Sequence, residues 1–127
     1  MKQCIKDGIA VQGYDALEFF NGKAVEGSKD YSVEYNGGKY LFSSEENKSK
    51  FIENPEAFSP QYGGFCAMAM TKGQELRPNP RCFSVENGKL YFFTRIFFGL
   101  LDAKKQWIKD PEEKRSSADE AWKKVNS

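Results

Sequence analysis

The sequence predicts an α+β domain in which two short β-hairpins form a small antiparallel sheet packed with helices, followed by a C-terminal helical segment. Two stretches of alternating apolar and polar residues each turn at an Asn-Gly pair, at 36–37 and at 87–88. Asn-Gly is a strong hairpin signal because both residues tolerate the positive φ angles of a tight turn. Between and after the hairpins, capping residues precede segments in which apolar residues have helical spacing.

The first predicted element is a short helix that begins after Asp15. Asp15 is a suitable N-cap, Glu18 stands at the capping-box position, and Tyr14 can pack on Phe19 across the helix start. Asn21-Gly22 follows, and because these residues readily adopt the left-handed conformation, we expect the helix to end there.

The two predicted hairpins share one pattern. In the first, residues 31–35 alternate apolar and polar side chains before the turn, and residues 39–42 resume after it. In the second, the segment from Cys82 to Thr94 turns at Asn87-Gly88. Runs of this kind, rich in aromatic and β-branched residues and bounded by turn residues, indicate strands. We therefore expect four strands.

Two further helices are predicted from their capping residues. Ser43 can cap a helix with Glu46 as its capping-box partner, and Pro55 ends that segment. Asp110 can cap the C-terminal helix, with Pro111 at the first helical position, which needs no N–H. Apolar residues then repeat at helical spacing at Ala118, Ala121, Trp122 and Val125.

Length and charge limit the classes of function. The 127 residues suffice for one domain, which we expect at 8–127 after an N-terminal tail at 1–7. Lys and Arg number 19 against 18 Asp and Glu, and this balance argues against nucleic-acid binding through a basic surface. The longest apolar run, residues 90–101, is shorter than the roughly 20 residues that span a bilayer. It is also interrupted by Arg95 and Gly99.

The N-terminal sequence is relevant to the cellular compartment of the protein. No charged leader followed by an apolar region precedes the predicted domain. We therefore expect an exported or periplasmic protein if a signal peptide has been removed, and a cytoplasmic protein otherwise.

The most unusual segment is Pro60-Gln61-Tyr62-Gly63-Gly64-Phe65-Cys66-Ala67. A Gly-Gly pair between aromatic residues, followed at once by a cysteine, predicts a tight backbone corner that holds a thiol. The chain has no histidine, so it lacks the commonest metal ligand and the most frequent general base. Cys66 is therefore the residue through which we expect any chemistry to run.

Three roles are open for Cys66. On a strand it would share one face with Met68 and Met70, and a thiolate with two thioethers suits Cu(I), whereas on a helix the three would diverge. If a helix begins near residue 65, its free amide groups would favour the thiolate, and Cys4 or Cys82 could act as the resolving thiol. As a buried thiol, Cys66 would be a packing residue.

A second segment of interest is Ile96-Phe97-Phe98-Gly99-Leu100-Leu101. If it is packed inside, it is the first turn of the helix that leads to Trp107. If it is exposed, it forms a surface for a homodimer or another protein partner, because large exposed apolar patches mark interaction sites. The residues of that surface would be Phe97, Phe98, Leu100 and Leu101.

Several motifs of this chain occur together in one known family. They are Gly13-Tyr14-Asp15, Tyr40-Leu41-Phe42-Ser43-Ser44, Phe51, Asn54-Pro55, the corner at 60–67, Asn87-Gly88-Lys89-Leu90-Tyr91 and Gln106-Trp107. Over about residues 8–125 the chain thus resembles the YHS-domain family. The glycine-cysteine corner is the most specific part of the resemblance.

The resemblance implies a small α+β module, of a kind often found in exported bacterial proteins or attached to metal-transport or oxygenase machinery. Related modules bind heavy metals through cysteines, in a pattern similar to Phe-Cys-Ser-x-x-Cys after the second strand. Here these two cysteine positions correspond to Ser43 and Asn47, whose side chains are poor ligands for a soft cation. The metal site of those relatives is therefore not expected in this segment.

Together, the residues and the resemblance predict a small binding module that is not an enzyme by itself. The expected ligand is a soft metal ion, copper or zinc, or a small molecule, and Cys66 would be the metal ligand. The predicted binding residues are Gln61, Tyr62, Gly63, Gly64 and Cys66. Two alternatives are open: thiol or redox chemistry at Cys66 with Cys82, and a structural or protein-interaction module that uses the 97–101 surface.

Overall fold

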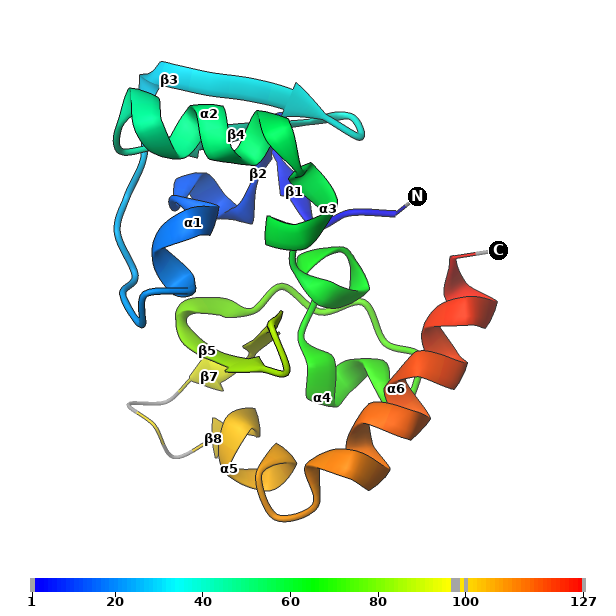
Figure 1. Cartoon of the computed structure of the whole chain (residues 1–127). Helices are drawn as coiled ribbons and strands as arrows, with labels where there is room; N and C mark the ends of the chain where they lie inside the picture. The colour runs from blue at the N-terminus through cyan, green and yellow to red at the C-terminus, as the bar shows by residue number, and fades with distance from the viewer. Residues whose placement is uncertain (1, 97–98, 100, 127) are drawn as a thin grey trace.

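The N-terminal half of the molecule is built on a four-stranded sheet with the strand order β1-β2-β4-β3. The computed structural model describes residues 2–96, 99 and 101–126 (Figure 1). The hairpin predicted first consists of β3 (Ser28–Tyr35) and β4 (Gly38–Phe42). On the other side of β4 lies β2 (Ile9–Ala10), which pairs with it in parallel, and β1 (Ile5–Lys6) forms the edge.

Helices of the N-terminal half cover this sheet and lead to the corner. Helix α1 (Ala16–Phe19) follows the 3-10 turn η1 (Val11–Gly13). Helix α2 (Glu45–Glu53) lies alongside β3 and β4, and α3 (Pro55–Phe58) follows it (Figure 1). The chain then enters η2 (Gln61–Gly64), the segment predicted as a tight corner.

The C-terminal half contains the second predicted hairpin, β5 (Asn79–Glu86) and β6 (Lys89–Phe93). This hairpin forms a sheet of its own, so the two hairpins do not share the one antiparallel sheet that we expect from the sequence. Helices α4 (Ala67–Met70) and α5 (Ala103–Trp107) pack on it, and α6 (Pro111–Val125) packs on α4. The α+β class and the C-terminal helix are confirmed.

Capping explains where α1 and α6 begin. The Asp15 carboxylate accepts a hydrogen bond from the Leu17 N–H at 2.9 Å. The Asp110 carboxylate likewise accepts one from the Glu113 N–H at 3.2 Å, with a proline at the first helical position. Each cap satisfies a backbone donor that has no partner within its own helix.

Helix α2 begins one residue later than predicted. Its N-cap is Ser44, whose hydroxyl accepts a hydrogen bond from the Asn47 N–H at 3.1 Å. The side chain of Ser43 is used elsewhere, in a hydrogen bond to Asp15. Two adjacent serines have equal capping chemistry, and their tertiary partners decide between them.

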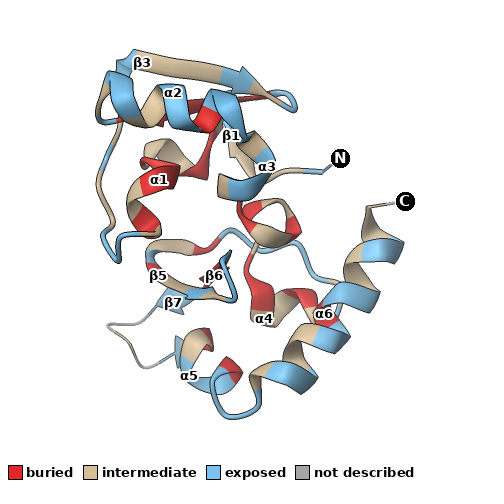
Figure 2. Ribbon diagram, viewed as in Figure 1, coloured by how far each residue is buried: buried red, intermediate tan, exposed pale blue. Residues whose placement is uncertain are grey.

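The two halves of the molecule join through β6, which is buried on both faces. Leu90 and Phe92 belong to a core in the N-terminal half, whereas Tyr91 and Phe93 belong to a second core around Trp107. Successive side chains of a strand point to opposite faces, so one strand can serve two cores. Figure 2 shows buried residues throughout the interior of both halves.

Part of the predicted tail at 1–7 takes part in the fold. Besides β1, the Cys4 N–H donates to the Gly63 carbonyl at 2.8 Å, and the Lys2 N–H donates to Asn126 Oδ1 at 2.8 Å. The start of the chain therefore lies against η2 and the end of α6, and the two termini lie close together (Figure 1).

The segment before α5 is a small β-ladder and not the first turn of a helix. β7 (Arg95–Ile96) pairs antiparallel with β8 (Leu101–Asp102), and α5 begins only at Ala103. Ile96 and Leu101 are 44% and 43% exposed. The homodimer through this segment stays a prediction, because the other residues of the predicted surface lie outside the described residues: Phe97, Phe98 and Leu100.

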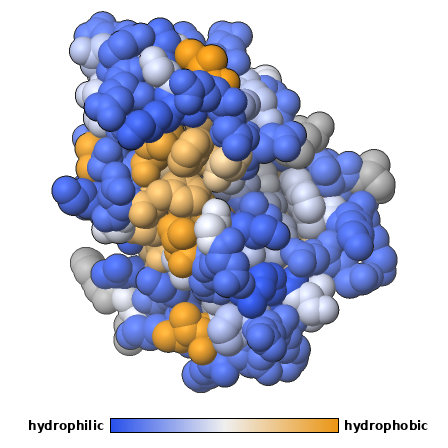
Figure 3. Space-filling model, in the orientation of Figure 1, coloured by the Kyte–Doolittle hydropathy of each residue, from blue (hydrophilic) through white to orange (hydrophobic). Residues whose placement is uncertain are grey.

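The surface of the molecule is mostly polar. On the face shown in Figure 3, apolar side chains gather in the middle, with polar residues above and below them. Between α1 and β5 lies an open groove lined in part by Phe20, Phe83 and Val85. None of the helices in the described part of the chain combines the length and the apolar character that a membrane crossing requires.

Candidate functional site

The corner predicted from the glycines is a sharp backbone reversal at η2. Tyr62, Gly63 and Gly64 all have positive φ angles, of 55°, 63° and 88°. A side chain at Gly63 would collide with the Lys2 carbonyl oxygen, so glycine is required there. For Tyr62, which is not glycine, the left-handed backbone conformation costs about 1–3 kcal/mol, and contacts of its side chain must offset that cost.

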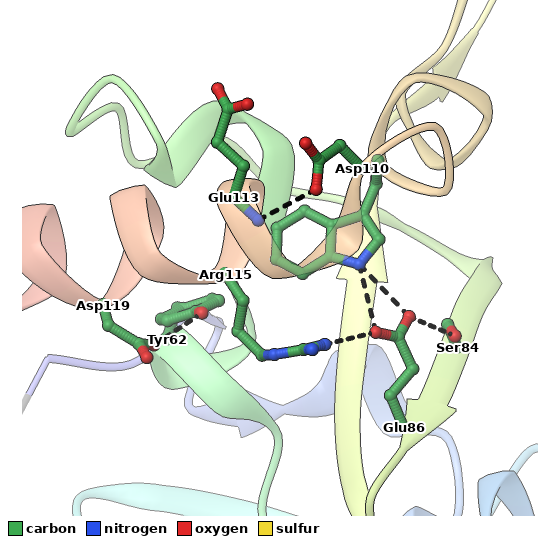
Figure 4. Close-up of polar contacts among 8 residues, drawn as sticks. Tyr62, Ser84, Glu86, Asp110, Glu113, Arg115 and Asp119 are labelled. Carbon is green, nitrogen blue, oxygen red and sulfur yellow. Dashed lines mark hydrogen bonds and ion pairs between the residues drawn. The ribbon is translucent and has the colours of Figure 1, made fainter.

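The Tyr62 side chain supplies those contacts. Its hydroxyl donates to Asp119 Oδ1 on α6 at 2.8 Å, and its ring packs against Tyr91 and Trp122 with centroid distances of 5.8 Å and 6.3 Å. Figure 4 shows the phenol directed at Asp119. Burial raises the pKa of the Tyr62 phenol, and the neighbouring Asp119 carboxylate raises it further, so the group remains a neutral donor.

A cavity of about 240 Å³ lies beside this corner. Four aromatic side chains form part of its wall: Tyr35 and Tyr40 from the first hairpin, Tyr62 from η2, and Trp122 from α6. We call this space the aromatic cavity. Its other lining side chains include Gln3, Glu56, Ser59 and Gln61.

The polar groups of the aromatic cavity are held by one another. The Tyr40 hydroxyl donates to Gln3 Oε1 at 2.6 Å, and Gln3 Nε2 donates to the Tyr35 carbonyl at 3.2 Å. Burial raises the pKa of Tyr40 to about 12. The Ser59 hydroxyl donates to the Pro55 carbonyl at 2.7 Å. The wall is therefore preorganised before any ligand arrives.

The predicted binding residues divide among three places. Gln61, Tyr62 and Gly63 line the aromatic cavity, whereas Gly64 lines a hollow of about 10 Å³ beside Cys4. Cys66 lies apart from both, on an open groove of about 180 Å³. The predicted binding residues therefore line three separate cavities and do not surround the Cys66 thiol.

Cys66 is a buried hydrogen-bond acceptor. It is 1% exposed, and its sulfur accepts a hydrogen bond from the Thr94 N–H at 3.2 Å. It precedes the four-residue helix α4, so Met68 and Met70 do not share a strand face with it. Met70 is fully buried, whereas Met68 lines the same groove as Cys66. The thiol therefore lies beside the end of β6, and one of the two methionines shares its groove.

The donors around Cys66 do not fit a soft-metal site. Thr94 Oγ1 is buried there without a hydrogen-bond partner, but a hydroxyl, one thiol and one thioether are a weak set for copper or zinc. Within residues 2–96, 99 and 101–126, no group of three or more His, Cys, Asp and Glu side chains could hold a metal ion.

The other two cysteines are also free. Burial and the nearby Asp102 carboxylate together raise the pKa of the Cys82 thiol to about 11. The Cys82 thiol donates to Asp102 Oδ1 at 3.6 Å. Burial also raises the pKa of Cys4, although the Arg77 guanidinium opposes the shift. Both thiols are therefore protonated at neutral pH, and a protonated thiol is a poor nucleophile.

We expect iodoacetamide at pH 7 to alkylate all three thiols more slowly than a free cysteine peptide, with half-buried Cys4 reacting first. Cys4 and Cys82 carry little thiolate, and Cys66 is 1% exposed, so its reaction requires local opening. Peptide mapping by mass spectrometry over time measures each rate, with the urea-unfolded chain as the control. A rate at Cys66 above that of the free peptide would instead support thiol chemistry there.

A hydrogen-bonded centre forms around Asp15 and includes Ser43 and Asn47, the two positions that the resemblance matches to cysteines. The fully buried Asp15 carboxylate accepts, at Oδ2, the Ser43 N–H at 2.8 Å, the Ser43 hydroxyl at 2.7 Å and the Asn47 amide at 2.9 Å. The Asn47 amide also donates to Glu18 Oε2 at 2.8 Å. Capping chemistry identified Asp15 as the helix N-cap, but its contacts with Ser43 and Asn47 could not be predicted from local sequence.

A second polar cluster holds α6 against β5. Arg115 Nη1 donates to Glu86 Oε1 at 2.7 Å, while the Trp107 indole and the Ser84 hydroxyl donate to Glu86 Oε2 at 3.1 Å and 2.8 Å. Figure 4 shows Arg115 and Ser84 approaching Glu86 from opposite sides. Because α6 also carries Trp122, this cluster fixes one wall of the aromatic cavity.

Comparison with known proteins identifies one family. The sequence model of the YHS domain matches residues 16–62, from the first residue of α1 to Tyr62. Neither a search of curated proteins nor a search of solved structures found a match. YHS domains are described as a metal-binding family, which is compatible with a small metal-binding module. Residues 16–62 thus match the YHS domain, the family that the motifs of the chain resemble.

Proposed function

We propose that this protein is a small, non-enzymatic binding module whose ligand occupies the aromatic cavity. The observation that carries the proposal is the cavity itself, about 240 Å³ in volume and lined by residues from the start, middle and end of the chain. Ligand sites are concave, mostly apolar and largely preformed, with a few well-placed polar groups. The aromatic cavity has each of these properties.

The size of the cavity indicates a small ligand. Pockets for drug-sized molecules are about 300–1,000 Å³ in volume, so the aromatic cavity takes a smaller molecule. Gln61 is half-buried on its wall and can supply a donor and an acceptor to that molecule. Under this proposal Cys66 is a packing residue, since its thiol lies on a different groove.

Two-dimensional ¹H–¹⁵N NMR of the full chain tests the proposal with a set of small amines, sugars and aromatic acids. The chain has two tryptophans, and only Trp122 lines the aromatic cavity. We expect at least one probe to shift the Trp122 indole and Gly63 amide signals while leaving the Trp107 indole, bound to Glu86, unchanged. If no probe shifts these two signals, the cavity is not a binding site.

A matched pair of variants links the signal to the cavity. Gln61→Ala should weaken binding of that probe about two- to tenfold, the effect of losing one hydrogen bond of about 0.5–1.5 kcal/mol. Gln106→Ala makes the same change on α5, at an exposed residue that lines the Cys66 groove, and should leave binding unchanged. Equal affinities of the two variants would place the bound probe outside the aromatic cavity.

A further inference from the structure

The aromatic cavity carries an electrostatic preference for a cation. Glu56 is its one charged lining residue, and it makes no ion pair within the described residues. A second carboxylate, Asp119, lies behind the Tyr62 ring and accepts its hydroxyl. Among the residues that the structure describes, no lysine or arginine side chain lines the cavity.

Two cationic side chains of neighbouring segments form ion pairs elsewhere. Lys2, whose backbone lies against Gly63, directs its ammonium group to Glu75 at 3.0 Å. Arg115, which influences Tyr62 electrostatically, is bonded to Glu86 at 2.7 Å. The charge that lines the cavity is therefore that of the Glu56 carboxylate, beside aromatic rings whose faces are negative.

Neither of the two ring pairs that line the cavity is a parallel stack. Tyr35 and Tyr40 have centroids 6.1 Å apart with their planes at 63°, and Tyr62 and Trp122 have centroids 6.3 Å apart at 67°. A flat ring ligand stacks best between parallel walls. Tyr40 and Tyr62 are only 1% and 4% exposed. A ligand therefore meets chiefly the half-buried rings of Tyr35 and Trp122, which suit a compact group.

Three of the four hydroxyl groups on the residues that line the cavity are already used as donors; the fourth belongs to Tyr35. Tyr40 donates to Gln3, Tyr62 donates to Asp119, and Ser59 donates to the Pro55 carbonyl. A sugar, which needs several hydrogen-bond partners, would find few donors free. A methylated ammonium group needs none, since it is held by aromatic faces and a nearby negative charge.

We propose that the aromatic cavity binds a methylated ammonium group of a small ligand, with Trp122 as the main cation–π partner. This inference rests on the proposed function, because it names the ligand class of the same cavity. Trp is the strongest cation–π partner among the aromatic side chains, and Glu56 supplies the complementary charge at the exposed side.

Choline and its neutral carbon isostere, 3,3-dimethyl-1-butanol, test the proposal by NMR titration of the full chain. The two have nearly the same shape and differ in charge, so their affinity ratio reports the recognition of a cation. We expect choline to shift the Trp122 indole and Gly63 amide signals and to bind at least about tenfold more tightly than the isostere.

Two variants test separately the contributions of the Trp122 ring and of the Glu56 charge. Trp122→Leu keeps an apolar side chain without a ring face and should remove most of the choline preference over the isostere. Glu56→Gln should weaken choline about two- to fivefold, as for an exposed charge pair, and leave the isostere unchanged. Glu120→Gln, an exposed change elsewhere on α6, is the control and should alter neither affinity.

The possible results distinguish this inference from the proposed function. Equal binding of choline and the isostere would overturn the cation preference while leaving the cavity a binding site. If other probes bind but neither choline nor the isostere does, the cation preference is likewise wrong and the cavity remains a binding site. If no probe of any class reaches Trp122 and Gly63, both proposals fail together.

Discussion

Asp15→Ala is expected to lower the free energy of unfolding by about 3–5 kcal/mol. The carboxylate is fully buried and accepts hydrogen bonds from Leu17, Ser43 and Asn47. Alanine would leave these donors without their acceptor at the point where α1, β4 and α2 meet. Urea denaturation followed by far-UV circular dichroism measures the change.

Two further variants control for the Asp15 result. Asp15→Asn keeps one oxygen but places an NH₂ group among donors, so we expect an intermediate loss of stability. Asn47→Ala removes only one of the donors and should cost about 1 kcal/mol. If Asp15→Ala costs no more than Asn47→Ala, the carboxylate is not the centre of this network.

Phe19→Ala is expected to cost about 3–5 kcal/mol and to loosen the junction between the two halves. Phe19 is fully buried in α1, and its ring meets those of Phe83 and Phe92 edge-on with centroid distances of 4.8 Å and 4.9 Å. Its removal leaves a cavity against the β5–β6 hairpin. Chemical denaturation measures the cost, and amide hydrogen exchange in β5 and β6 reports the loosening.

The neighbouring residue provides a matched control. Phe20 is half-buried and its ring meets that of Phe58, with a centroid distance of 5.4 Å. Phe20→Ala makes the identical chemical change one residue away, and we expect less than half the loss. Equal losses would mean that burial of Phe19 between the halves is not what holds them together.

The Asp15 network also bears on the metal site that the family resemblance brings to mind. By that resemblance Ser43 and Asn47 correspond to cysteines of metal-binding modules, and here both side chains donate to one carboxylate. Hydroxyl and amide groups that donate hydrogen bonds to a buried anion are not arranged to bind a cation. Neither Ser43 nor Asn47 lines the aromatic cavity, so its proposed ligand does not depend on these two positions.

Local chemistry determined much of this protein from sequence alone. The turns at Asn36-Gly37 and Asn87-Gly88 have positive φ angles throughout, as their residue types predict. The caps at Asp15 and Asp110 were readable because a cap and its helix lie within a few residues of each other. The family, too, could be recognised from short motifs.

Tertiary structure alone decided the rest, because it depends on contacts between distant parts of the chain. The parallel pairing of β2 with β4 and the two buried faces of β6 follow from how whole elements pack. The aromatic cavity brings Gln3 together with Trp122, and no local pattern encodes that meeting. The hydrogen bond of the Cys66 sulfur with the Thr94 N–H is fixed by the same long-range packing.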